Sequence, residues 1–479
     1  MSQLLTKLKT TPRGWHTNSK ERKSYYLYFA GQNAIYNLVA GFLTAYLLFL
    51  GVDPTKSGTV MLIIKIWDAV NDALFGVIFD SVKFKSGKKY LPWLKISTAL
   101  TPIATILMFI IPKAGGENLK IAWFAIAYII WDTVYTLCDV PIYGVITSMT
   151  ENLDERNTML SYKSIWGGIG SGFTTVVATL LVGEFIKSNY TVVAVLVSVF
   201  AAATMVPALL HLKERFKPEE EESFTIRRML SYLIRNKYLL IYYFGYFFYS
   251  AANVTNALNT FASYYLFHNS QFALVVGAVN MVPSLLISLV VPQLTRRMDK
   301  MKLYLICCFA FVAASTATWA FGYNSMVLYL AFTTVRSIPL SIIGVLMFMF
   351  TPDCAEYGKY ATGIDAKGIT FAIQTFMVKL TAAVSNSLVL FLLGLKWSEW
   401  KTYAAENFDE LNQIGATQTP HALNFLWFIY VMIPAIGCLL AALVWLFYGL
   451  NDKDVQIMAN CNAGKITRQE AESLLSRKY

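Results

Sequence analysis

Three aspartates interrupt an otherwise apolar stretch near the start of the chain, IWDAVNDALFGVIFDS at 66–81. Asp68 and Asp72 are four residues apart, so on a helix they share one face at a separation of about 6 Å. Carboxylates this close repel each other unless they share a proton or a cation, and hard oxygen ligands suit hard cations. We expect a Na⁺ or H⁺ site at this pair. The alternative is that the aspartates only pair with Lys65 or Lys379 and hold helices together.

A second apolar stretch, WDTVYTLCDVPIYG, carries polar side chains at helical spacing. Asp132, Thr136 and Asp139 fall on one helix face, from which the Thr136 hydroxyl can add an oxygen to a cation held by the aspartate pair. Tyr135 and Tyr143 can stack on a sugar-like solute or hydrogen-bond to it, although ordinary packing is the more common role of such a tyrosine.

A lysine interrupts a third apolar stretch, FAIQTFMVKLTAAVSNS. An ammonium in such a segment is tolerated only where it reaches a carboxylate or a cavity, so Lys379 is expected to neutralise the aspartate cluster, with Lys65 and Asp132 as further charge partners. The Thr375 hydroxyl adds a hydrogen-bonding group to the same helix. Arg336 lies in another apolar run, and the sequence assigns it no role.

These residues must be positioned by membrane-spanning helices. Of 479 residues, 56% are hydrophobic and 14% are charged, whereas soluble domains carry about a quarter charged residues. About a dozen runs approach the ~20 apolar residues that span a bilayer. They lie roughly at 25–50, 58–80, 91–112, 119–148, 160–185, 190–211, 238–266, 271–294, 303–322, 326–351, 368–395 and 421–449.

The placement of basic residues predicts the orientation. Of the 40 Lys and Arg, roughly 30 fall on the side of the two termini, about six on the other side and about four inside the spans. Both termini are therefore expected in the cytoplasm, in a multi-pass protein of the plasma (inner) membrane. The net charge of +11 suits anionic lipid headgroups and requires no nucleic acid. The six cysteines imply no disulfide framework, and a monomer is expected.

The chain is predicted to be an all-α membrane protein with two six-helix bundles, the organisation of the major facilitator fold. The expected parts are a cytoplasmic tail at 1–24, a bundle at 25–212, a cytoplasmic loop at 213–237, a second bundle at 238–449 and a cytoplasmic tail at 450–479. In the last part, Thr467 and Glu470 predict a capping box before a short helix.

Segments in both halves resemble the glycoside–pentoside–hexuronide:cation symporters, a melibiose permease-like family of the major facilitator superfamily. The second span and its loop, WDAVNDALFGVIFDSVKFKSGKKYLPW, are similar to the signature of that family. So are Tyr135, Thr136, Asp139 and Pro141 on the fourth span, and the later segment DCAEYGKYATGIDAKGITFAIQTFMVK. The resemblance covers about Tyr25 to Lys379, in the family's order.

The resemblance implies roles for three groups of residues. A cation, Na⁺ if the protein is Na⁺-coupled, would lie at Asp68, Asp72, Thr136 and Asp139, with Lys379 beside it. The solute would contact Gln32, Asn33, Tyr135, Asp139, Tyr143, Lys163 and Thr375. A cytoplasmic gate would include Asp80, Lys88, Asp353, Glu356, Asp365 and Lys367.

The chain departs from the family pattern at positions that bear on the solute. Gln32 and Asn33 stand where an aspartate is common, and an amide donates as well as accepts, which favours a carboxylate-bearing or differently hydroxylated solute. Lys163 replaces an arginine. Tyr143 and Gly344 replace aromatic residues of melibiose permease.

The expected function is cation-coupled symport of a sugar, glycoside or uronide by alternating access, with Na⁺ or H⁺ as the coupling ion and no cofactor. The alternative is a carrier of the same fold for a lipid-like or other amphiphilic solute. An intramembrane enzyme is not expected, because Asp68 and Asp72 share one helix and the four histidines lie at loops or span ends without a metal-ligand cluster.

Overall fold

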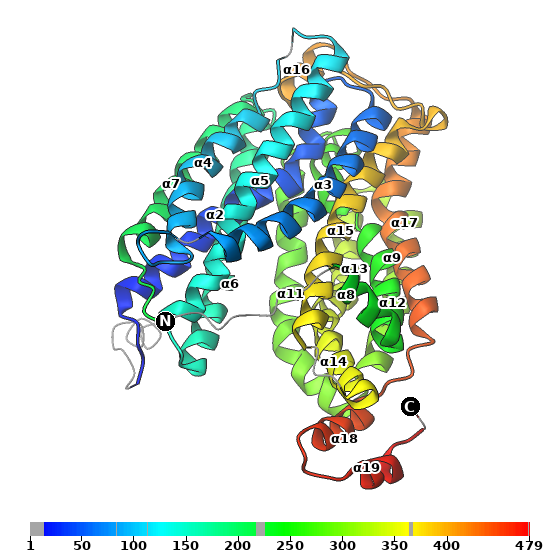
Figure 1. Ribbon diagram of the computed structural model, residues 1–479. Coiled ribbons are helices and arrows are strands. Elements are labelled where there is room, and N and C mark those ends of the chain that lie inside the picture. Colours follow the sequence, from blue (N-terminus) through cyan, green and yellow to red (C-terminus); the bar gives the residue numbers. More distant parts are fainter. Residues whose placement is uncertain (1–13, 83, 113, 217–225, 364–366, 478) are drawn as a thin grey trace. The chain divides into compact units, whose positions relative to one another are not determined.

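The computed structural model describes residues 14–82, 84–112, 114–216, 226–363, 367–477 and 479 (Figure 1). For some residues within these ranges the structure describes the backbone but not the side chain. They are residues 65, 66, 68–70, 72–74, 76–81, 153, 157, 226–230, 285, 288, 289, 324, 367, 368 and 372, and many of them lie on one helix.

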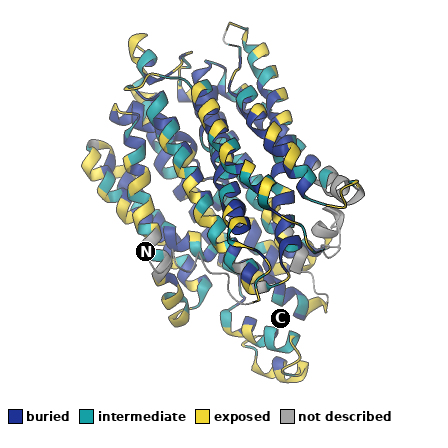
Figure 2. Ribbon diagram, turned by 90° about the vertical axis from the view of Figure 1, so that its left-hand side faces the viewer, coloured by how far each residue is buried: buried dark blue, intermediate teal, exposed yellow. Residues whose placement is uncertain are grey.

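The described residues are almost entirely helical and form two compact units. The first unit comprises Met1–Ser223 together with Lys401–Thr417, and the second comprises Phe224–Trp400 and Gln418–Tyr479. Eight helices in the described part of the chain are long and apolar enough to span a membrane. Many large apolar side chains are exposed, including Leu210, Val327 and Phe447, and Figure 2 shows exposed positions along the helices. Exposed apolar surface of this extent is typical of a protein whose helices face the hydrocarbon core of a membrane.

Six long helices and one short one make up the described part of the first unit. They are α2 (Ser19–Phe49), α3 (Pro54–Ser81), α4 (Leu91–Met108), α5 (Glu117–Met149), α6 (Leu153–Val182), α7 (Tyr190–His211) and α16 (Phe408–Gln413). α2 packs against α6 and α7, and glycine allows this close approach. A Cβ on Gly170 of α6 would lie 1.9 Å from the carbonyl oxygen of Ala30 on α2. Small residues at such crossings are typical of membrane helices.

The second unit contains the remaining helices. They are α8 (Ile226–Arg235), α9 (Lys237–Ala251), α10 (Thr255–Phe267), α11 (Phe272–Arg297), α12 (Lys300–Phe321), η1 (Gly322–Asn324), α13 (Met326–Leu346), η2 (Met347–Met349), α14 (Phe350–Thr362), α15 (Lys367–Gly394), η3 (Lys396–Ser398), α17 (Pro420–Trp445), α18 (Asp452–Asn462) and α19 (Arg468–Leu474). The capping box predicted at Thr467 and Glu470 is confirmed at the start of α19.

One predicted span differs from the structure. The run at 238–266 is two helices, α9 and α10, separated at Ala252–Val254. A break at membrane depth exposes backbone groups that must find partners. The Ser385 hydroxyl of α15 donates to the carbonyl oxygen of Asn253 at 2.9 Å, which satisfies one of these groups.

The segment Lys401–Thr417 connects α15 to α17 in the chain but packs with the first unit. Ala405 N donates to the Phe49 carbonyl oxygen at 2.9 Å, and Asn407 Nδ2 donates to the Lys187 carbonyl oxygen at 2.9 Å. The Phe408 ring is fully buried, with its centroid 4.9 Å from that of Phe49. Backbone bonds and apolar packing therefore fasten this segment to the ends of first-unit helices.

Candidate solute and cation site

Two helices of the first unit bring an amide and a carboxylate together. Gln32 on α2 is 2% exposed, and its Nε2 donates to Asp139 Oδ1 on α5 at 2.6 Å. The remaining amide oxygen of Gln32 is buried and has no hydrogen-bond partner. A hydrogen bond to a carboxylate is among the stronger ones. The bond therefore fixes the position of the Asp139 carboxylate and leaves an acceptor beside it.

A third helix adds a positive charge. The Lys163 ammonium on α6 lies 3.9 Å from the centroid of the Tyr143 ring and 4.8 Å from that of Phe29. These two rings meet edge to face at 5.5 Å. Aromatic faces attract a cation, and more so where water is excluded. Lys163 is thus held at the Phe29 ring and at the ring of Tyr143, which follows Asp139 by one turn of α5.

The predicted aromatic residue Tyr135 belongs to a stack that sequence reasoning found only in part. Its ring lies parallel to that of Trp131 at 4.8 Å and tilted against that of Tyr36 at 5.8 Å. Tyr36 and Phe29 were missed. Both share a face of α2 with Gln32, at offsets of four and three residues, so helical spacing was the signal that would have found them.

Asn33 does not join this cluster. Its Nδ2 donates to the carbonyl oxygen of Phe29 on its own helix at 2.9 Å, and its amide lies against Gly167 of α6. Of the two adjacent amides proposed to contact the solute, the structure brings only Gln32 to Asp139.

Of the predicted cation site, the side chains of Asp68 and Asp72 lie outside the described residues, as do those of the predicted charge partner Lys65 and the predicted gate residue Asp80. The adjoining face of α5 is described. There, Thr136 Oγ1 donates to the carbonyl oxygen of Asp132 at 3.0 Å, and the Asp132 carboxylate is buried.

Asn71 links α3 to this face, and sequence reasoning missed it. The side chain is 1% exposed, and its Nδ2 donates to Thr136 Oγ1 at 3.0 Å and to Asp132 Oδ2 at 3.3 Å. Its place in the chain, beside Asp72, was the available signal. Because an amide carries no charge, its presence in an apolar run costs less than that of a carboxylate and is a weaker signal in the sequence.

Two further predicted residues, Thr375 and Lys379, belong to the second unit. Thr375 is exposed on α15, and its hydroxyl donates to the carbonyl oxygen of Phe371 on the same helix at 3.2 Å. Lys379 lies on α15, half-buried. Its pairing with the aspartates of the first unit stays a prediction.

Two of the predicted gate residues hold the C-terminal tail. Asp353 on α14 forms an ion pair with Lys300, which also pairs with Asp452 of α18 at 3.2 Å. The Glu356 carboxylate accepts a hydrogen bond from Asn462 Nδ2 at 2.9 Å. Lys88 is exposed on its loop, and the side chains of Asp365 and Lys367 lie outside the described residues.

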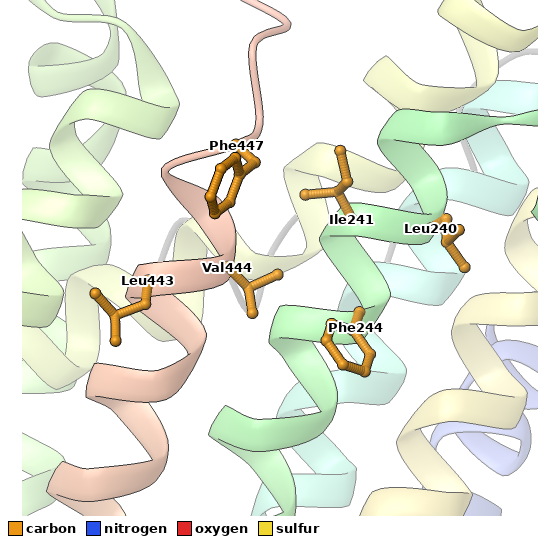
Figure 3. Close-up of a pocket in the computed structure, with 6 residues that line it drawn as sticks. All are labelled: Leu240, Ile241, Phe244, Leu443, Val444 and Phe447. Atoms are coloured by element: carbon orange, nitrogen blue, oxygen red, sulfur yellow. The ribbon is translucent and has the colours of Figure 1, made fainter.

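A groove of about 580 Å³ lies elsewhere, on α9 and α17 of the second unit (Figure 3). Six apolar side chains line it: Leu240, Ile241, Phe244, Leu443, Val444 and Phe447. Sugar recognition requires placed polar groups, which this lining does not offer. The groove is therefore not the candidate solute site.

Comparisons with known proteins agree with this architecture. A model of the family described as MFS/sugar transport protein matches residues 24–452. The chain is 22% identical over 453 residues to an isoprimeverose transporter of Lactiplantibacillus pentosus, covering 92% of this chain and 90% of that one. It is 26% identical over 441 residues to a glucuronide carrier protein homolog of Escherichia coli K12, covering 90% and 92%.

Solved structures show the same fold. The nucleoside transporter NupG matches with a TM-score of 0.60 and 14% identity, covering 89% of this chain and 99% of that one. A D-xylose–proton symporter matches with a TM-score of 0.53 and 14% identity, covering 88% and 95%. The all-helical major facilitator fold predicted from the sequence is confirmed.

Proposed function

The chain belongs to the MFS/sugar transport protein family of multi-pass membrane proteins, and from that premise we propose that it carries a sugar, glycoside or uronide across the plasma membrane together with a cation. Relatives named as an isoprimeverose transporter, a glucuronide carrier homolog and a putative sulfoquinovose importer support a sugar-like solute. The two halves would expose one site to each side of the membrane in turn.

The observation that carries the proposal is the cluster of Gln32, Asp139, Tyr143 and Lys163. A carboxylate fixed by an amide accepts hydrogen bonds from sugar hydroxyls, and an ammonium donates to hydroxyl or acidic oxygens. The aromatic ring offers an apolar face to the sugar. Donors, acceptors and an aromatic face held within one helical unit are what a polyhydroxylated solute requires.

Cation coupling would arise at the adjoining face of α3 and α5. Asn71, Asp132 and Thr136 form a hydrogen-bonded group there, beside the sequence positions of Asp68 and Asp72. Na⁺ or a proton would neutralise the aspartate pair. α5 also carries Asp139, so a cation that orders this helix would raise the affinity for the solute. The solute would raise the affinity for the cation by the same factor.

A binding screen on the purified protein tests the proposal. Monosaccharides, disaccharides and glycosiduronic sugars are titrated with and without Na⁺, and binding is followed by thermal unfolding and by calorimetry. We expect at least one sugar to bind, with an affinity that depends on Na⁺ or on pH. Folded protein that binds no sugar under any ionic condition would rule the proposal out.

A further inference from the structure

Arg336 lies at the midpoint of α13, ten residues from either end. At a rise of about 1.5 Å per residue, each end of the helix is about 15 Å away, so the side chain lies well inside an apolar segment long enough to span a membrane. It is 4% exposed. A guanidinium at this depth is costly and is rarely without a partner.

The described residues give this guanidinium no counter-charge. Its Nη1 is buried and makes no hydrogen bond, and no described carboxylate forms an ion pair with it. The ring of Phe311 on α12 lies beside it, with the centroid 5.6 Å from Cζ. The nearby Tyr430 hydroxyl already donates to Asn259 at 2.7 Å and accepts from Tyr329 at 3.1 Å. A ring face attracts the cation but does not neutralise it.

Two further buried polar groups lie on the same pair of packed helices, α12 and α13. Thr333 precedes Arg336 by one turn on α13, and Ser315 follows Phe311 by one turn on α12, which packs against α13. Residues three or four apart share a helix face. Ser315 is 0% exposed and Thr333 is 1% exposed, and neither hydroxyl has a hydrogen-bond partner. Buried polar groups usually have a hydrogen-bond partner, and the spacing of these three places them one turn from each other or from Phe311 on two packed helices.

We propose that Arg336, Ser315 and Thr333 bind an anion. A guanidinium only donates hydrogen bonds, and hydroxyls can turn their protons toward the same acceptor. Water would satisfy the hydroxyls but would leave the charge unneutralised. The anion is either a small inorganic ion such as chloride or the acidic group of a transported sugar. Binding of a sugar's acidic group rests on the proposed function, whereas binding of a small inorganic ion does not.

Thermal unfolding in matched sodium salts tests the chloride source. Replacing sulfate by chloride is expected to raise the Tm of the wild-type protein by about 3 °C more than that of Arg336→Gln. Bromide should give an anomalous scattering peak at α13. Arg297→Gln is the matched control, because Arg297 is exposed at the end of α11, and it should respond as the wild type does.

Calorimetry with glucuronate and glucose tests the solute source. Arg336→Gln is expected to lower the affinity for glucuronate about tenfold, as the loss of one charge-assisted contact would, and to leave that for glucose unchanged. If Arg336→Gln does not fold, Ser315→Ala and Thr333→Val keep the charge and should each reduce the same anion effect. The proposal is overturned if chloride and bromide change the Tm of the wild type and the variants equally and glucuronate also binds them all with equal affinity. A protein that binds no sugar but responds to chloride through Arg336 would refute only the proposed function.

Discussion

Replacing Gln32 by leucine is the most informative perturbation of the candidate solute site. The two side chains are similar in size, so Gln32→Leu removes the amide that donates to Asp139 at 2.6 Å and leaves little cavity at this 2% exposed position. A hydrogen bond to a charged group contributes about 1.5–3 kcal/mol. If Asp139 binds the solute from the position that Gln32 fixes, the dissociation constant should rise about 10- to 150-fold.

The assay is equilibrium binding of a transported sugar to purified protein, with Tm measured in parallel. Asn37→Leu is the matched control, because Asn37 is another α2 amide, which donates to the Ser171 carbonyl oxygen and to Thr175 Oγ1, both at 2.9 Å. It should lower the Tm without changing the affinity. If Gln32→Leu keeps the wild-type dissociation constant within twofold, then Asp139 is not organised by Gln32 for solute binding.

Two further predictions concern the ends of the helices. Burial acts to raise the pKa of Asp454, but hydrogen bonds from Ser476 and Tyr479 outweigh it and hold this pKa below its usual value. The docking of the last residues, Ser476 and Tyr479, on α18 is therefore fully stabilised above about pH 4 and weakens as the pH falls further. Limited proteolysis with pepsin can follow this loss, and an unchanged cleavage rate in Asp454→Asn would contradict it. Phe408→Ala should cost about 3–5 kcal/mol of packing against Phe49 and raise hydrogen exchange across Lys401–Thr417, and unchanged exchange would show that the ring does not fasten the segment.

Much of the fold could be predicted, because a membrane helix must be both apolar and about 20 residues long. The same criterion fails where a helix is polar or interrupted. α14 (Phe350–Thr362) follows a span that was predicted to end at residue 351. Its buried face carries Cys354 and Tyr357 among charged neighbours, so average hydropathy does not reveal it. At the break between α9 and α10, the carbonyl oxygen of Asn253 accepts a hydrogen bond from Ser385, which lies far away in the chain and gives no local signal.

The candidate site was predictable where charge or aromatic character made a residue costly or conspicuous. Asp139 and Tyr143 were selected from one sequence stretch, Gln32 and Lys163 were selected from the family resemblance, and the structure brings Gln32 to Asp139 and Lys163 to Tyr143. Asn71 was not selected, because a neutral amide gives no such signal until its partners on α5 are known. Arg336 was noticed but unassigned, because the sequence does not show that its guanidinium is buried without a hydrogen-bond partner at Nη1.

Gradient-driven uptake tests the central claim most directly. The protein is reconstituted into liposomes, and accumulation of a bound sugar is measured with an inward Na⁺ gradient, an inward proton gradient and no gradient, for the wild type and for Asp72→Cys. We expect one of the two gradients to drive uptake above equilibrium in the wild type and neither to do so in Asp72→Cys. Uptake that ignores both gradients and is unaltered by the substitution would contradict cation-coupled symport.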